Sequence, residues 1–112
     1  MRTVFDFTNA ELKTCIGSIM SELYGSWIDV KSYRYKLKLL QSLLELLTGR
    51  DGLDEDDLNH YRHDLEVVDK EVSEIDEGEK PNGGIIKREC YLYGYVSRDG
   101  VTEDVKEYVD SN

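Results

Sequence analysis

A wide apolar arc between residues 30 and 48 constrains the fold of this chain more than any other sequence feature. Two neighbouring apolar stripes step along it by three and four residues: Val30, Tyr33, Leu37, Leu40, Leu44 and Leu47, and beside them Tyr35, Leu39, Leu43 and Leu46. A helix that is apolar over so wide an arc is buried against more than one neighbour. We therefore predict a central helix that begins after Asp29, a favourable N-cap, and ends at a left-handed Gly49.

Two further helices flank this central one in the sequence. Thr8 and Glu11 have the spacing of a capping box, so we expect a first helix over about residues 9–24. A third helix is predicted to begin at Asp54 and to end at Gly78. Its apolar residues keep a heptad spacing: Leu58, Tyr61, Leu65, Val68, Val72 and Ile75. The short connection between the second and third helices favours an antiparallel hairpin.

The two ends of the chain carry strand-like patterns. Residues 1–7 alternate weakly and predict a short strand, and residues 85–97 alternate more clearly. The tail over residues 101–112 fits a strand or a short helix. The predicted fold class is α+β, with three helices that include a central antiparallel helical hairpin, packed with a small antiparallel β-sheet formed mainly by the C-terminal segment. We expect one domain over residues 1–112, mainly helical to residue 79 and β-rich from residue 80.

Acidic residues are concentrated between Asp51 and Glu79. This segment holds thirteen acids and two bases, a net charge of 2 − 13 = −11, while the whole chain has a formal charge of −10. The charge argues against direct binding to nucleic acid, which is bound by cations, and against docking on an anionic membrane. It favours a basic protein partner, because opposite charges steer association.

About half of these acids have an intramolecular explanation. In an antiparallel hairpin, the acids of residues 66–77 would face the bases of residues 31–38. Five acids at the turn between the two helices have no such counter-charge: Asp51, Asp54, Glu55, Asp56 and Asp57. Helix capping and solubility are the simpler explanation of these five. The functional hypothesis is that they bind the basic partner.

Three tyrosines near the C-terminus complete the candidate partner-binding surface: Tyr91, Tyr93 and Tyr95. Tyrosine is enriched in protein interfaces. The stretch "KRECYLYGYV" also resembles the aromatic strand of RNA-recognition modules, in which alternate rings stack on bases. Glu89 stands where that family has a glycine, and no second such strand is visible. Binding of single-stranded nucleic acid is therefore a third hypothesis, which the net charge opposes; tyrosines that pack on a helix are the simpler explanation.

No catalytic or cofactor motif stands out, and we expect neither cofactor nor metal. His60 and His63 lack a third zinc ligand at a defined spacing. A calcium-binding EF-hand loop is excluded, because Asp56 and Arg62 occupy the positions of its glycine and glutamate. The two cysteines and the absence of a secretory signal favour reduced, buried thiols and a cytoplasmic location.

These patterns predict a small acidic, non-enzymatic binding protein. We expect an inhibitor or an immunity-type protein that blocks a basic surface of a target protein, such as a surface that binds nucleic acid. The alternative is a homo-oligomeric structural or adaptor protein, a homodimer for instance, that pairs through the heptad seam of the third helix.

Overall fold

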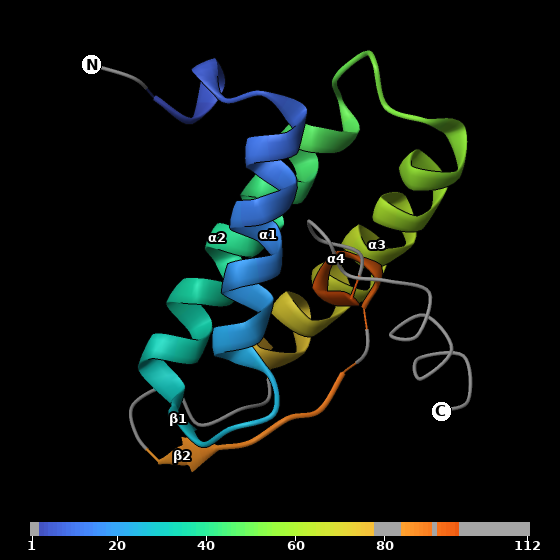
Figure 1. The fold of residues 1–112 in the computed structure, drawn as a ribbon. Helices are drawn as coiled ribbons and strands as arrows, with labels where there is room; N and C mark the ends of the chain where they lie inside the picture. The colour runs from blue at the N-terminus through green and yellow to red at the C-terminus, as the bar shows by residue number, and fades with distance from the viewer. Residues whose placement is uncertain (1–2, 78–83, 91, 97–112) are drawn as a thin grey trace.

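The computed structural model of this chain describes residues 3–77, 84–90 and 92–96, and it is mainly helical with a small two-stranded antiparallel sheet (Figure 1). Its elements, in chain order, are η1 (Val4–Asp6), α1 (Asn9–Leu23), β1 (Ile28–Asp29), α2 (Val30–Thr48), α3 (Glu55–Glu77), β2 (Ile85–Ile86) and α4 (Tyr93–Val96). Within these residues, no helix combines the length and the apolar character that crossing a membrane requires.

Capping residues set the starts of α1 and α2 where the sequence predicts them. The Thr8 hydroxyl accepts a hydrogen bond from the Glu11 amide at 3.1 Å, and the Glu11 carboxylate accepts one from the Thr8 amide at 2.9 Å. The Asp29 carboxylate accepts a hydrogen bond from an amide in the first turn of α2. The expected left-handed Gly49 is wrong, because its φ is −89°. The left-handed residue of this turn is Gly52, with φ +90°.

Helix α2 packs against both α1 and α3 and supplies much of the core. Its buried side chains are Val30, Tyr33, Leu37, Leu40, Leu43, Leu44 and Leu47. Full burial of one such side chain contributes roughly 1.5–3 kcal/mol. The second predicted stripe turns outward at its start, where Tyr35 and Leu39 are exposed. The Gln41 amide of α2 donates to Asp69 of α3 at 2.7 Å, which fixes where the two helices meet.

The short helix α4 contacts both α1 and α3, and Figure 1 shows it in front of α3. Gly94 makes this close approach possible. A Cβ atom at Gly94 would lie 2.9 Å from Ile16 Cγ2 and 3.1 Å from Tyr61 Cε1. Leu92, just before α4, is buried in the same core.

The strand predictions for the two chain ends are wrong where the structure describes them. Residues 4–6 form the 3₁₀ helix η1, which a capping box between Thr3 and Asp6 stabilises. Of the strand expected over residues 85–97, the described residues form β2, which pairs with β1 just before α2, and an isolated bridge between Arg88 and Tyr24. The following residues 93–96 are helical. The ambiguous tail and the predicted helix end at Gly78 lie outside the described residues.

Candidate protein-binding surface

The connection between α2 and α3, together with the first turn of α3, presents four exposed carboxylates, which we name the acidic turn: Asp51, Asp54, Glu55 and Asp56. The Asp54 carboxylate accepts a hydrogen bond from the Asp56 amide at 3.2 Å, as an N-cap does. Acids in the first turn of α3 also favour the positive end of its dipole. The ion pairs among residues 3–77, 84–90 and 92–96 do not include these four carboxylates. Their charge therefore faces solvent.

Contacts with the start of α1 hold the acidic turn in place. The Asn9 side-chain amide donates a hydrogen bond to the Asp51 carbonyl at 3.2 Å. The Arg50 guanidinium donates to the Phe5 carbonyl at 2.9 Å and to the Phe7 carbonyl. A turn that is already ordered loses less conformational entropy on binding than a mobile loop does. The acidic turn is thus suited to present its charge in one arrangement.

Asp57, the fifth predicted acid of this region, points into the molecule. It is half-buried, and one carboxylate oxygen accepts from Lys13 Nζ at 2.9 Å. The other oxygen accepts from the Tyr93 hydroxyl. Asp57 therefore connects α3 to both α1 and α4, and the structure separates it from the four exposed acids.

The predicted tyrosines that the structure describes lie on α4 and not on a strand. The Tyr93 ring stacks on His60 at a centroid distance of 4.4 Å and meets Tyr61 edge-on at 5.2 Å. Tyr95 is half-buried. Tyr91 lies outside the described residues. The resemblance to RNA-recognition modules assumed alternating side chains on a strand, and the helical positions of Tyr93 and Tyr95 remove that basis.

Sequence reasoning missed the role of Asp64, a charged residue with only 1% of its surface exposed. Its two carboxylate oxygens accept hydrogen bonds from the backbone amides of Tyr93, at 2.9 Å, and Gly94, at 2.8 Å. Burial raises the pKa of Asp64 to about 6, although these two amides act in the opposite direction. Since both oxygens are occupied by the start of α4, this carboxylate anchors α4 and does not face a substrate.

Glu71 forms a second inward-facing contact of α3. Its carboxylate accepts hydrogen bonds from the Tyr24 hydroxyl at 2.7 Å and from the Tyr33 hydroxyl. Burial, followed by the negative charge of Glu71, raises the pKa of Tyr24. Burial and the hydrogen bond to Glu71 raise the pKa of Tyr33. This network joins the ends of α1 and α3 to the start of α2, and it is structural.

We expected the bases of α2 to face the acids of α3, but the contacts of Lys36, Asp69 and Glu71 differ from this expectation. Lys36 pairs with Glu22 of α1 at 2.9 Å. Asp69 and Glu71 of α3 instead accept hydrogen bonds from neutral donors of α2, an amide and a tyrosine hydroxyl. At these contacts, neutral donors support the register of α2 against α3.

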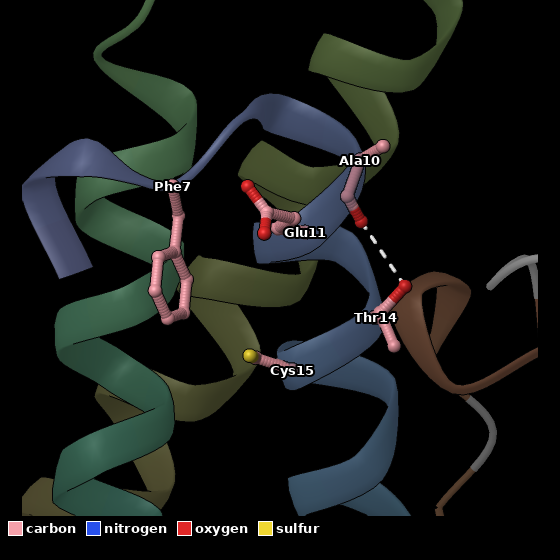
Figure 2. Close-up of a pocket in the computed structure, with 5 residues that line it drawn as sticks. All are labelled: Phe7, Ala10, Glu11, Thr14 and Cys15. Carbon is pink, nitrogen blue, oxygen red and sulfur yellow. Dashed lines mark hydrogen bonds between the residues drawn. The ribbon is translucent and has the colours of Figure 1, made fainter. Parts of the chain in front are cut away.

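The first half of α1 carries an open hollow of about 340 Å³ (Figure 2). The hollow is lined by Phe7, Ala10, Glu11, Thr14 and Cys15. Figure 2 shows Phe7 and Cys15 pointing to one side of α1, and Ala10 and Thr14 to the other. The Thr14 hydroxyl donates to the Ala10 carbonyl at 3.1 Å, and Glu11 belongs to the capping box of α1. The polar groups of the lining are thus already bonded, and the remaining surface is mostly apolar.

The other candidates from the sequence have simple placements. His60 and His63 are exposed on α3. In the part of the chain that the structure describes, no three His, Cys, Asp or Glu side chains gather as a metal site would require. Cys15 and Cys90 form no disulfide, and both are half-buried where the sequence predicted buried side chains. Comparison with protein-family models, with curated proteins and with solved structures finds no match for this chain.

Proposed function

We propose that this chain is a small acidic, non-enzymatic binding protein of the cytoplasm, an inhibitor or immunity-type protein that blocks a basic surface of a target protein. The observation that carries the proposal is the acidic turn, whose four carboxylates are exposed on a connection braced by Asn9 and Arg50. In this proposal, α2 and α3 act as an antiparallel hairpin with the acidic turn at its tip. The target surface carries Lys and Arg, and a surface that binds nucleic acid is one example.

Electrostatics supports the proposal through rate and specificity more than through raw affinity. One exposed ion pair contributes only ~0.2–1 kcal/mol. A concentrated field of one sign, however, raises association rates by roughly 10- to 1,000-fold, and salt screens this effect. Asp57 has intramolecular partners, so the proposal assigns partner binding to the acidic turn and leaves Asp57 in a structural role.

A charge-neutralised variant tests the proposal. It replaces three exposed acids of the acidic turn: Asp54→Asn, Glu55→Gln and Asp56→Asn. Asparagine at position 54 retains an N-capping side chain, so the start of α3 is preserved. A matched control removes the same charge from exposed positions elsewhere on α2 and α3: Glu45→Gln, Glu66→Gln and Glu74→Gln.

The measurement is capture of a partner from a lysate of cells that naturally produce this chain, at about 50 mM and about 500 mM salt. We expect wild type and control to retain the same basic protein at low salt, and the turn variant to lose it. With the purified partner, the association rate of the turn variant should fall roughly tenfold. Equal association rates for all three proteins would remove the acidic turn from the binding surface.

The alternative, a homo-oligomer that pairs through the apolar seam of α3, has weaker support. Tyr61, Val68 and Ile75 of this seam are buried within the chain itself, at 1%, 0% and 2% exposure. These side chains are not available to a second copy without unfolding. A dimer measured by light scattering that is unaffected by the turn variant would favour the alternative.

A further inference from the structure

We propose that the outward side of α2 binds an acidic amphipathic helix of a second protein partner. We name this surface the lysine face, and its residues, all exposed, are Lys31, Tyr35, Lys38 and Leu39. The inference goes beyond the proposed function and does not depend on it, because the lysine face and the acidic turn carry opposite charges.

Helical geometry places the residues of the lysine face on one side of α2. Lys31, Tyr35 and Lys38 are separated by four and then three residues, the spacing that repeats along one side of an α-helix, and Leu39 follows Tyr35 by one turn. The buried residues of α2 occupy the opposite side and belong to the core. Through that side α2 packs against both α1 and α3. The lysine face is therefore directed away from the core.

Positive charge is concentrated along this part of α2. Between Val30 and Leu44 the chain has four bases and no acid. The acids that contact this stretch lie at its two sides: Glu22 of α1 pairs with Lys36 at 2.9 Å, and Asp69 of α3 accepts from Gln41 at 2.7 Å. The lysine face itself contributes two lysines and no carboxylate. A partner that complements it carries negative charge.

The acidic turn is too distant to cancel this local charge. Lys38, the nearer lysine, precedes the end of α2 at Thr48 by ten residues, or about 15 Å along the helix axis. The Debye length at physiological salt is about 8 Å, so charges at this separation are largely screened from each other. A short acidic segment therefore meets the local positive charge. A long polyanion such as nucleic acid would also extend over the negative parts of the molecule.

The apolar residues of the lysine face favour a helix as the bound segment. Tyr35 leaves 71% of its surface exposed and Leu39 leaves 41%, and burial of such side chains is favourable. Tyrosine is also enriched in protein interfaces. The spacing of four and three residues is the one along which two α-helices pack. The complementary segment is thus a helix with two acids seven residues apart and leucine between them on the same side.

Two synthetic peptides serve as probes. Each has about 16 residues, enough to form a helix, and both have the same composition. The acidic amphipathic peptide carries its glutamates and leucines on one side, and the reordered peptide carries them on opposite sides. Binding is followed by fluorescence anisotropy at about 50 mM salt. We expect wild type to bind the acidic amphipathic peptide roughly tenfold more tightly than the reordered peptide.

Variants of the lysine face separate its charge from its apolar surface. Lys31→Gln combined with Lys38→Gln should weaken binding of the acidic amphipathic peptide roughly tenfold, and Tyr35→Gln should weaken it roughly fivefold. The matched control, Lys70→Gln combined with Lys87→Gln, removes the same charge from exposed positions outside the face and should bind as wild type does. Because all five positions are exposed, the midpoints of urea unfolding should stay close to that of wild type.

The turn variant distinguishes this inference from the proposed function. It should bind the acidic amphipathic peptide at least as tightly as wild type, because the charge that it lacks is negative. Equal affinity of wild type and the double variant of Lys31 and Lys38 would overturn the inference and leave the proposed function untouched. Two other results would also overturn it. Equal competition by a single-stranded oligonucleotide would assign the lysine face to phosphates, and a wild-type dimer that dissociates in the double variant, measured by light scattering, would assign it to a second copy.

Discussion

At the residue scale, acidic side chains have two roles in and beside α3: some form hydrogen bonds within the chain, and others face solvent. Asp57, Asp64 and Glu71 follow at seven-residue intervals beside the apolar seam, and each accepts hydrogen bonds from other helices or their flanking residues. The acidic turn instead faces solvent. The sequence places the three spaced acids along one flank of the seam. Their partners, such as Tyr24 and Tyr93, are far away in the chain, so no local pattern could have predicted these contacts.

The raised pKa of Asp64 predicts how stability depends on pH. Its pKa is about 6 in the folded chain, against 3.8 ordinarily. The folded state therefore binds more protons than the unfolded state between about pH 4 and pH 6. The contribution of Asp64 is most favourable below about pH 4 and declines as the pH rises to about 6, by roughly 3 kcal/mol for a difference of about two pH units.

The variant Asp64→Asn tests this dependence, because its amide does not titrate. Urea unfolding of both proteins from pH 4 to pH 7 should show wild type losing stability relative to the variant as the pH rises. At every pH the variant lacks one carboxylate acceptor for the amides of Tyr93 and Gly94. Parallel stability curves for the two proteins would contradict the raised pKa.

Gly94→Ala should destabilise the chain by about 1–3 kcal/mol, because the added methyl group overpacks the core at Ile16 and Tyr61. The sign of the change in the free energy of unfolding is informative, because in an unobstructed helix alanine would be favoured over glycine by about 1 kcal/mol. The midpoint of urea unfolding measures the change, with Glu66→Ala at an exposed helical position as the reference. A more stable Gly94→Ala would mean that α4 is not packed this closely.

At the scale of elements, local sequence signals determine where the long helices α1 and α2 begin, whereas tertiary contacts determine that the short helix α4 forms. The capping residues Thr8 and Asp29 lie beside the helices they start, so the sequence alone predicts these positions. The alternation of residues 85–97 predicts a strand, yet residues 93–96 form the helix α4. The distant Asp64 binds the first amides of that helix, and Gly94 fits against α1 and α3. Neither contact is visible in a local pattern.

The cap of α2 gives a prediction at this scale. Asp29 accepts a hydrogen bond from the Ser32 amide at 2.9 Å. Asp29→Ala should lower the free energy of unfolding by about 1 kcal/mol, whereas Asp29→Asn, which keeps a capping oxygen, should change it by only a few tenths of that amount. Chemical unfolding followed by circular dichroism measures both. Equal losses in the two variants would show that the carboxylate charge matters here and that the capping geometry does not.

At the scale of the whole molecule, the uneven charge was evident from the sequence, but its division into structural and exposed acids was not. The first 50 residues carry seven bases and five acids, a net +2, and the remaining 62 carry seven bases and nineteen acids, a net −12. The structure turns Asp57, Asp64 and Glu71 inward and leaves the acidic turn outward. The candidate surface is therefore smaller than composition alone suggests.

This charge distribution predicts opposite effects of salt on folding and on binding. From about 10 mM to about 150 mM salt, the Debye length falls from about 30 Å to about 8 Å. Screening reduces repulsion among the exposed acids, whereas the buried contacts of Asp64 are little affected. Thermal unfolding in sodium chloride should therefore show a gain of about 1 kcal/mol, or a midpoint higher by about 4–8 °C, and a smaller gain in the turn variant. A midpoint that falls with salt would mean that ion pairs such as Lys13–Asp57 outweigh the repulsion. The same screening weakens a complex that forms by charge steering. A salt series measured on both folding and partner binding therefore separates the destabilising effect of the acidic turn on the fold from its favourable effect on binding.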